Sequence, residues 1–129
     1  MDFLNEAKKI AERSSIRKHR TGVVFVRKNK IISNGWSHVP HYKLYGKRSL
    51  HAEMHALARG RRKNLSGAEC WIVTLTRCGN SVNSLPCLDC AIALYTAGIY
   101  RVYWPSSNLA YNVFDINETT FADLKVYEQ

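Results

Sequence analysis

Helix-like and strand-like segments alternate along the chain, and their order limits the possible folds more than any other feature of the sequence. The predicted order is helix, strand, strand, helix, strand, helix, strand, strand, helix, without an internal repeat or a low-complexity linker. Strands and helices that alternate in this way form a sheet whose faces the helices cover. We therefore expect an α/β fold with a mixed sheet, in one domain that spans residues 1–129.

Apolar spacing and turn signals place the individual elements. Helical spacing covers residues 3–18, and two strand-like runs flank Asn29-Lys30 as a hairpin. Start and stop residues delimit the later helices: Ser49 before a helix that runs to about residue 62, Pro86 and Gly98 at the two ends of the next, and Asn117 before the last. The other strands are predicted at residues 69–76, 99–104 and 110–116, with a loop over 77–85.

The composition indicates a globular protein that works inside the cell. Hydrophobic residues make up 46% of the chain, but no apolar run approaches the ~20 residues that a membrane span requires. Residues 1–14 contain acids and lack the apolar block of a signal peptide. We expect a cytoplasmic protein without a membrane partner, whose four cysteines do not form a disulfide framework.

Positive charge is concentrated in the first half of the chain. Residues 1–63 carry 16 Lys and Arg against four Asp and Glu, whereas residues 64–129 carry three against six. A basic half is typical of proteins that bind a nucleotide or a polynucleotide, although a solvated basic surface has the same composition.

Three residues form a candidate metal site. Cys87 and Cys90 are three residues apart at a predicted helix start, where the helix N-terminus favours thiolates. His51 lies at the start of another helix that follows a strand, so both helices present their N-termini at one edge of the sheet. Three nitrogen and sulfur ligands with an open fourth position are typical of catalytic zinc.

Glu53 is the candidate catalytic residue because it lies two residues after His51, within reach of a metal-activated water but outside the ligand set. His55 is four residues after His51, but a zincin pair needs Glu directly after the first His, and that residue is Ala52. We interpret His55 as a core or interface residue of the helix.

Two other interpretations of the cysteines do not need an enzyme of this type. Cys87 and Cys90 could form a redox disulfide, or the cluster could be a structural zinc knuckle that adds Cys78 to His51, Cys87 and Cys90. The zinc knuckle does not explain a carboxylate at Glu53, and a redox pair does not need His51 as a third ligand.

The His51-Ala52-Glu53 run followed by Pro86-Cys87-Leu88-Asp89-Cys90 resembles the signature of the cytidine/deoxycytidylate deaminase family. The resemblance extends over roughly residues 3–104, and the short basic chain is similar to small phage- or virus-encoded members. It implies a three-layer α-β-α fold with a five-stranded mixed sheet and a homo-oligomer. It also implies Zn²⁺ on His51, Cys87 and Cys90.

The resemblance further implies hydrolytic deamination of a cytosine nucleoside or nucleotide. Glu53 would take a proton from the attacking water and deliver it to the ring nitrogen and then to the leaving ammonia. The Ala52 N–H would bind the ring carbonyl, and backbone carbonyls near Ser84 would accept the exocyclic amine. Asn34 resembles the asparagine that contacts the sugar in some relatives.

The sequence leaves the substrate open among cytidine, deoxycytidine, dCMP and single-stranded DNA or RNA. Only residues 105–109 join the last two predicted strands, which favours an antiparallel hairpin and excludes a crossover helix. The basic loop over residues 38–48 could grip a 5′-phosphate through His38, His41, Lys43, Lys47 or Arg48. It could equally follow a single strand, with Trp36, Tyr42, Tyr45 and Trp104 as stacking surfaces. A zinc-containing nucleic-acid-binding module without catalysis is the alternative from another class.

Overall fold

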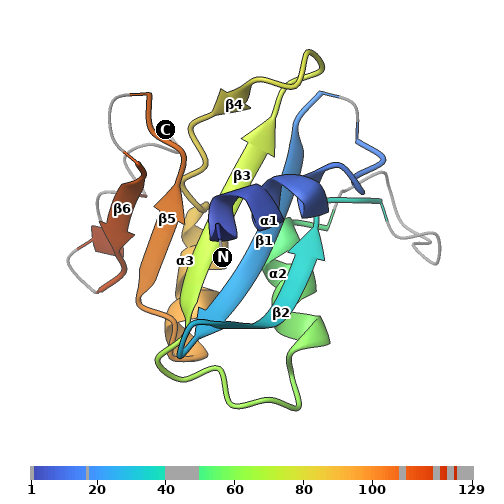
Figure 1. Ribbon diagram of the computed structural model, residues 1–129. Coiled ribbons are helices and arrows are strands. Elements are labelled where there is room, and N and C mark those ends of the chain that lie inside the picture. Colours follow the sequence, from blue (N-terminus) through green and yellow to red (C-terminus); the bar gives the residue numbers. More distant parts are fainter. Residues whose placement is uncertain are drawn as a thin grey trace.

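The computed structural model describes residues 2–16, 18–39, 50–107, 110–117, 120–121 and 124. These residues form one mixed sheet with the strand order β2-β1-β3-β5-β6 (Figure 1). The strands are β1 (Arg20–Arg27), β2 (Lys30–Trp36), β3 (Glu69–Leu75), β5 (Arg101–Trp104) and β6 (Asn112–Asp115). A two-residue strand within the predicted loop over 77–85, β4 (Ser81–Val82), pairs with β3 outside this order.

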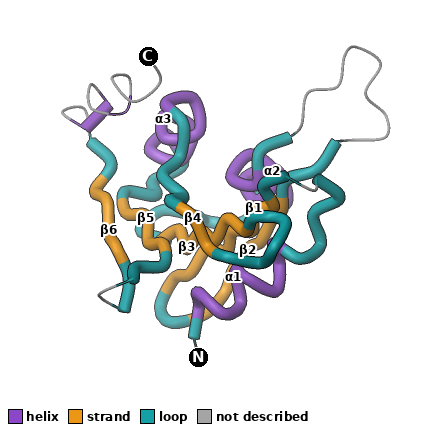
Figure 2. Tube along the Cα trace, turned by 90° about the horizontal axis from the view of Figure 1, so that it is seen from above, coloured by secondary structure: helices purple, strands orange, loops and turns teal. Residues whose placement is uncertain are grey.

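Helices cover both faces of the sheet. Helix α1 (Phe3–Ala11) packs on β1 and β3 on one face, and α2 (Ala52–Arg59) and α3 (Leu88–Thr96) lie on the other (Figure 2). Strands β3 and β5 are parallel, whereas β5 and β6 pair antiparallel. The predicted three-layer α-β-α architecture and the antiparallel end of the sheet are confirmed.

The alternation of side chains along β1 divides the interior into two cores. Val23 and Phe25 pack with residues of α2 and α3, whereas Val24 and Val26 pack against α1. Successive residues of a strand point to opposite faces, so this one strand supplies apolar side chains to both layers. These four side chains are at most 2% exposed, as expected of a central strand covered on both sides.

Several predicted element boundaries are wrong. Helix α1 ends at Ala11 and not at residue 18, because the Ser14 hydroxyl accepts a hydrogen bond from the Ile16 N–H (3.2 Å) and so favours a turn over further helix. Helix α2 begins after His51 and ends at Arg59, and α3 begins after Cys87, so Pro86 precedes the helix. The predicted cap Ser49 lies outside the described residues.

The first hairpin turns one residue earlier than predicted. Lys28 and Asn29 have φ angles of 51° and 63°, and β2 already begins at Lys30. Two consecutive residues with positive φ are typical of the type I′ turns that fit the twist of paired strands. At the other end of the chain, the Asn117 Oδ1 atom accepts a hydrogen bond from the Thr120 N–H (3.0 Å), and residues 120 and 121 are helical.

Gly35 allows α2 to approach β2 closely. A Cβ atom at Gly35 would lie 2.4 Å from the Ala56 nitrogen and 2.6 Å from the Ala52 oxygen, distances that real contacts do not show. The Ser33 hydroxyl, two residues earlier on the same face of β2, donates to the Ala56 carbonyl (2.8 Å). These contacts fix the position of the helix that carries His51 and Glu53 at its start.

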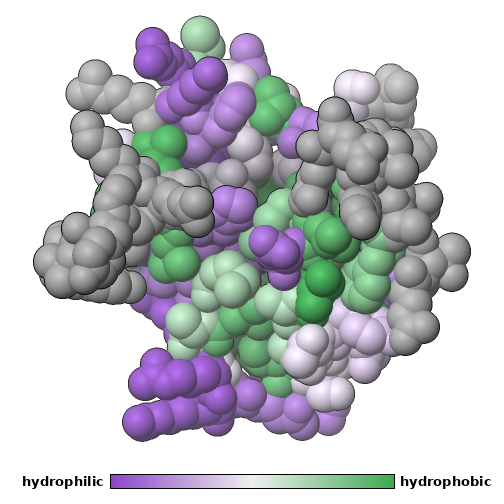
Figure 3. Space-filling model, turned by 180° about the vertical axis from the view of Figure 1, so that it is seen from behind, coloured by the Kyte–Doolittle hydropathy of each residue, from purple (hydrophilic) through white to green (hydrophobic). Residues whose placement is uncertain are grey.

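The outer surfaces of α2 and α3 carry exposed apolar side chains. Met54 on α2 and Ile92 on α3 are 40% and 43% exposed, and Figure 3 shows apolar surface over the middle of the molecule from this side. Within the described part of the chain, none of the helices has the length and apolar character needed to cross a membrane. The predicted homo-oligomer stays a prediction.

Candidate active site

The N-termini of α2 and α3 lie next to each other and bring three potential metal ligands together. His51 is the N-cap residue of α2, Cys87 is the N-cap residue of α3, and Cys90 lies in the first turn of α3. The ligand atoms of these residues all lie within 4.8 Å of one another. The convergence predicted from the two helix starts is therefore present in the fold.

The distances within this cluster fit a tetrahedral zinc ion. The His51 Nδ1 atom lies 3.3 Å from the Cys90 Sγ atom and 3.6 Å from the Cys87 Sγ atom. Zinc–sulfur bonds of about 2.3 Å and zinc–nitrogen bonds of about 2.0–2.1 Å at a tetrahedral angle separate nitrogen and sulfur ligands by about 3.6 Å. One nitrogen and two sulfur donors are also the donor types that zinc prefers.

The cluster also provides a thiolate. Hydrogen bonds from the Cys90 side chain and backbone, together with the nearby His51, lower the pKa of the Cys87 thiol to about 5. The pKa of Cys90 is raised, because its thiol is hydrogen-bonded to Cys87 and buried. In addition, the Cys90 backbone N–H donates to the Cys87 Sγ atom (3.4 Å), a bond that suits a charged sulfur at a helix start.

Glu53 lies in the first turn of α2 and is only 6% exposed. Burial raises the pKa of its carboxyl group above the ordinary value, and the neighbouring His51 partly offsets this effect. A buried carboxyl with a raised pKa in a cavity is typical of groups that transfer protons in catalysis.

Glu53 lines a cavity of about 440 Å³ together with the metal-ligand cluster. Two ligands of the cluster, His51 and Cys87, border the same cavity. Residues from six parts of the chain complete its wall: Ile16, Lys18 and His19 after α1, Thr21 of β1, Ser37 after β2, Ala52 of α2, Ile72 and Thr74 of β3, and Asn83, Ser84 and Leu85 before α3.

Hydroxyl groups on one wall of this cavity are held by hydrogen bonds. Ser37 Oγ accepts from the Thr21 N–H (3.0 Å), and the hydroxyls of Thr21 and Thr74 are 3.0 Å apart. Ser84 Oγ accepts from the Thr74 N–H (3.1 Å) and donates to the Val82 carbonyl (3.0 Å). Sequence reasoning missed Thr21, Ser37 and Thr74; the position of Ser37 at the end of a predicted strand was the only available signal.

The structure brings some of the predicted substrate contacts together and leaves others apart. Ala52 and Ser84 line the cavity with Glu53. Asn34 borders a different cavity, of about 210 Å³, with Arg59 and Lys63. Trp104 borders another, of about 820 Å³, which shares Asn83 with the cavity that Glu53 lines. The predicted phosphate and stacking residues at positions 41–48 lie outside the described residues.

His55 lies outside the ligand cluster. Its Nδ1 atom accepts a hydrogen bond from the Trp36 N–H (3.1 Å), and its ring packs edge-on against the rings of Trp36 and His38, with centroids 4.5 Å away in each case. Of the two other cysteines, Cys70 is buried and Cys78 is exposed, and neither belongs to the cluster.

Comparison with known protein families identifies this arrangement. The family profile of the cytidine and deoxycytidylate deaminase zinc-binding region matches residues 1–106. The chain belongs to the cytidine and deoxycytidylate deaminase family. This match includes all four central residues of the site and confirms the family resemblance seen in the sequence. Among curated protein sequences, no significant match is found.

Solved structures of deaminases share the fold of this family member. The dCMP deaminase of the cyanophage S-TIM5 in complex with dCMP and dUMP is 18% identical, with a TM-score of 0.67 over 96% of this chain and 87% of that one. The cytidine deaminase of Burkholderia pseudomallei is 19% identical, with a TM-score of 0.65 over 95% of this chain and 92% of that one. At these identities the similarity establishes the deaminase fold.

Proposed function

We propose that the protein hydrolyses the exocyclic amine of a cytosine nucleoside or nucleotide, giving the uracil form and ammonia, and that it requires one zinc ion. The observation that carries the proposal is the buried Glu53 carboxyl, which lines one cavity with His51 and Cys87 of the ligand cluster. Burying a carboxyl costs free energy, so its position beside a metal-ligand set favours a role in proton transfer.

His51, Cys87 and Cys90 would hold the zinc ion. When bound, zinc would act as a Lewis acid that polarises water and lowers its pKa. The two cysteine thiolates would offset the charge of the cation, so a neighbouring base is needed to take the proton from the water. Glu53 is two residues from His51 and buried in the same cavity, which suits it to this role.

Glu53 would carry protons between water and substrate. As a carboxylate it would accept a proton from the attacking water and donate it to the ring nitrogen. It would then accept the second proton of the same oxygen and donate it to the exocyclic amine, which leaves as ammonia. Its pKa is raised by burial, which brings the group closer to the pH at which it must both accept and donate.

The start of α2 would orient the cytosine ring. The first N–H groups of a helix have no partner within the helix, and Ala52 is the first residue of α2. We propose that the Ala52 N–H binds the ring carbonyl and that backbone carbonyls near Ser84 accept the exocyclic amine. The cyanophage dCMP deaminase, which was solved with dCMP and dUMP, supports a nucleotide substrate for this chain.

One observation favours a polynucleotide as the alternative substrate. The cavity that Trp104 borders shares Asn83 with the catalytic cavity, and an aromatic side chain beside a base pocket suits stacking of a neighbouring base. A zinc-bearing nucleic-acid-binding module without catalysis is the second alternative.

A panel of substrates tests the proposed function. The zinc-loaded protein is incubated with cytidine, deoxycytidine, CMP, dCMP and a cytosine-bearing oligonucleotide, and uracil formation and ammonia release are measured. We expect turnover of at least one monomer, with a Glu53→Ala variant as the blank. Turnover of the oligonucleotide alone supports the polynucleotide alternative, and binding without any turnover supports the non-catalytic module.

A further inference from the structure

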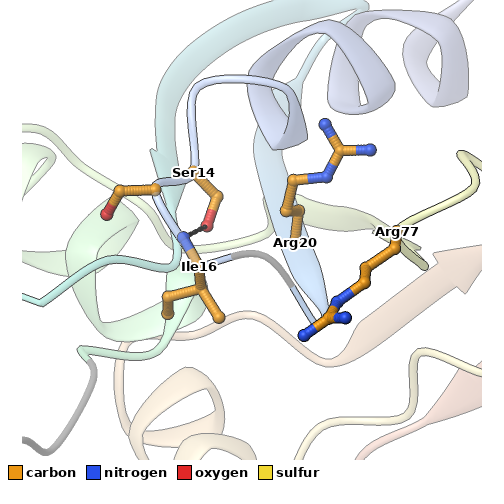
Figure 4. Close-up of a pocket in the computed structure, with 5 residues that line it drawn as sticks. Ser14, Ile16, Arg20 and Arg77 are labelled. Carbon is orange, nitrogen blue, oxygen red and sulfur yellow. Dashed lines mark hydrogen bonds between the residues drawn. The ribbon is translucent and has the colours of Figure 1, made fainter.

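A second cavity, of about 470 Å³, adjoins the catalytic cavity. It is lined by Ser14, Ser15, Ile16, Arg20 and Arg77, and Ile16 also lines the cavity that contains Glu53. Figure 4 shows the two arginine side chains on one side of this second cavity and Ser14 and Ile16 on the other. Arg20 is the first residue of β1, and Arg77 lies in the loop after β3.

The two guanidinium groups have no acidic partner in the described part of the chain. The ion pairs found there join Lys9 to Glu6 and Arg101 to Asp115, and no carboxylate lines the cavity. Arg20 is anchored by a hydrogen bond from its Nη2 atom to the Thr76 carbonyl (3.3 Å), directly beside Arg77. Both arginines line this one cavity, so an anion bound there would be attracted by two positive charges.

Hydrogen bonds fix this cavity relative to the catalytic one. The hydroxyls of Ser14 and Ser37 are 3.0 Å apart, and both residues are buried. Ser14 lines the arginine cavity, whereas Ser37 lines the cavity of Glu53. Hydrogen bonds therefore hold the wall between the two cavities in place. A binding site for one end of a substrate requires such a fixed position relative to the site that binds the other end.

We propose that this cavity binds a phosphate group of the substrate, with Arg20 and Arg77 as its ligands. The inference rests on the proposed function and deepens it, because it assigns the phosphate to residues that the sequence did not single out. Guanidinium groups match phosphate oxygens in geometry and form charge-assisted hydrogen bonds with them. The phosphate is either the 5′-phosphate of a nucleotide or a backbone phosphate of a strand.

Arg77 offers the cleaner test, since it is exposed and outside any strand, whereas Arg20 is part of β1. The zinc-loaded Arg77→Ala variant is compared with the wild type on deoxycytidine, dCMP and a cytosine-bearing oligonucleotide. We expect the ratio of kcat/KM for the phosphate-bearing substrate to that for deoxycytidine to fall by about 10- to 100-fold, the effect of losing one charged hydrogen-bond donor. Arg61→Ala, an exposed arginine that borders neither cavity, is the matched control.

A binding measurement keeps the test independent of turnover. Calorimetric titration measures the dissociation constants of two pairs of ligands for the wild type, Arg77→Ala and Arg61→Ala. The first pair is dUMP and deoxyuridine, and the second is the cytosine-bearing oligonucleotide and deoxycytidine, which carries no phosphate. Tighter binding of the phosphate-bearing ligand that Arg77→Ala selectively weakens supports the subsite, even if no substrate is deaminated and the proposed function fails. If dUMP is the ligand affected, the phosphate is that of a nucleotide; if only the oligonucleotide is affected, it is that of a strand. Equal effects of Arg77→Ala and Arg61→Ala, or equal binding with and without phosphate, would overturn the proposal.

Discussion

The Nδ1 atom of His51 lies 3.3 Å from the Sγ atom of Cys90, which is 39 residues further along the chain. Neither residue is close to the other in sequence, and the contact exists because each is attached to the start of a helix on the same face of the sheet. The close approach of α2 to β2 at Gly35 sets the position of His51. The metal-ligand geometry is thus a consequence of how the helices pack on the sheet.

The first prediction concerns the metal. The holoprotein should contain one zinc ion per chain, and Cys87→Ala should lose most of it, because two remaining ligands cannot complete a tetrahedral site. Metal content after dialysis is measured by mass spectrometry. The exposed Cys78 lies outside the cluster, so Cys78→Ala should retain its zinc. Equal zinc loss in the two variants would contradict the three-ligand site.

The second prediction concerns Glu53. Glu53→Gln has almost the same shape but cannot exchange protons with water and substrate, so turnover should fall by at least ~10²–10⁴-fold, the usual contribution of general acid–base catalysis. Zinc content and the far-ultraviolet circular dichroism spectrum should be unchanged. A variant that keeps most of its activity would show that Glu53 is not the proton carrier.

The convergence of His51, Cys87 and Cys90 and the position of Glu53 beside them could be predicted from the sequence because they depend on local patterns. Helix starts are recognisable, and a helix that follows a strand presents its N-terminus at a known edge of the sheet. The position of Asn34 depends instead on strand register. Ser33 and Gly35 face α2, so the side chain between them points to the other face of the sheet and away from Glu53.

The hydroxyl-lined wall and the arginine cavity could not be predicted from the sequence. Ser14 and Ser37 are 23 residues apart, and serine is too common in loops for such a pair to be recognised. Arg20 and Arg77 come together only because β1 and β3 are neighbours, with Arg20 paired to Leu75 in the register of the sheet. The basic charge indicated an anionic partner, but only the folded chain shows which arginines share a cavity.

The third prediction concerns the pH dependence of stability. Burial and the nearby His38 and Arg59 lower the pKa of His55 below its ordinary value of 6.5. The folded protein therefore binds this proton less readily than the unfolded chain, so the stabilisation is present above pH 6.5 and is lost as the pH falls through the lower folded pKa. We expect the Tm to decrease between pH 7 and pH 5.

The His55→Asn variant separates this effect from other titrations. Asn offers an acceptor near the position of Nδ1 for the Trp36 N–H but does not titrate. Its Tm should vary less with pH over the same range than that of the wild type. Parallel pH profiles for the two proteins would refute the assignment to His55.

The fourth prediction concerns the packing of α2. Gly35→Ala would place a Cβ atom against the backbone of Ala52 and Ala56, so the helix must move, at a cost of about 1–3 kcal/mol in the free energy of unfolding. Urea denaturation measures this cost. Gly79→Asn is the control, because Gly79 has a φ of 85° with open space around it, and Asn tolerates positive φ. Similar unfolding midpoints for Gly35→Ala and the wild type would show that α2 is not fixed by this contact.

The last prediction concerns the wall between the two cavities. Ser37 is 7% exposed, and its hydroxyl accepts from the Thr21 N–H and contacts the Ser14 hydroxyl. Ser37→Ala removes both contacts and leaves the Thr21 N–H without its acceptor, which should lower the free energy of unfolding by about 1–3 kcal/mol. Substitution of the exposed Ser66 by Ala should change it far less.

If the wall positions substrate, Ser37→Ala should also raise KM more than it lowers kcat, whereas loss of stability alone would leave KM unchanged. Steady-state kinetics below the unfolding temperature of the variant distinguish these outcomes, and an unchanged KM would restrict Ser37 to a structural role.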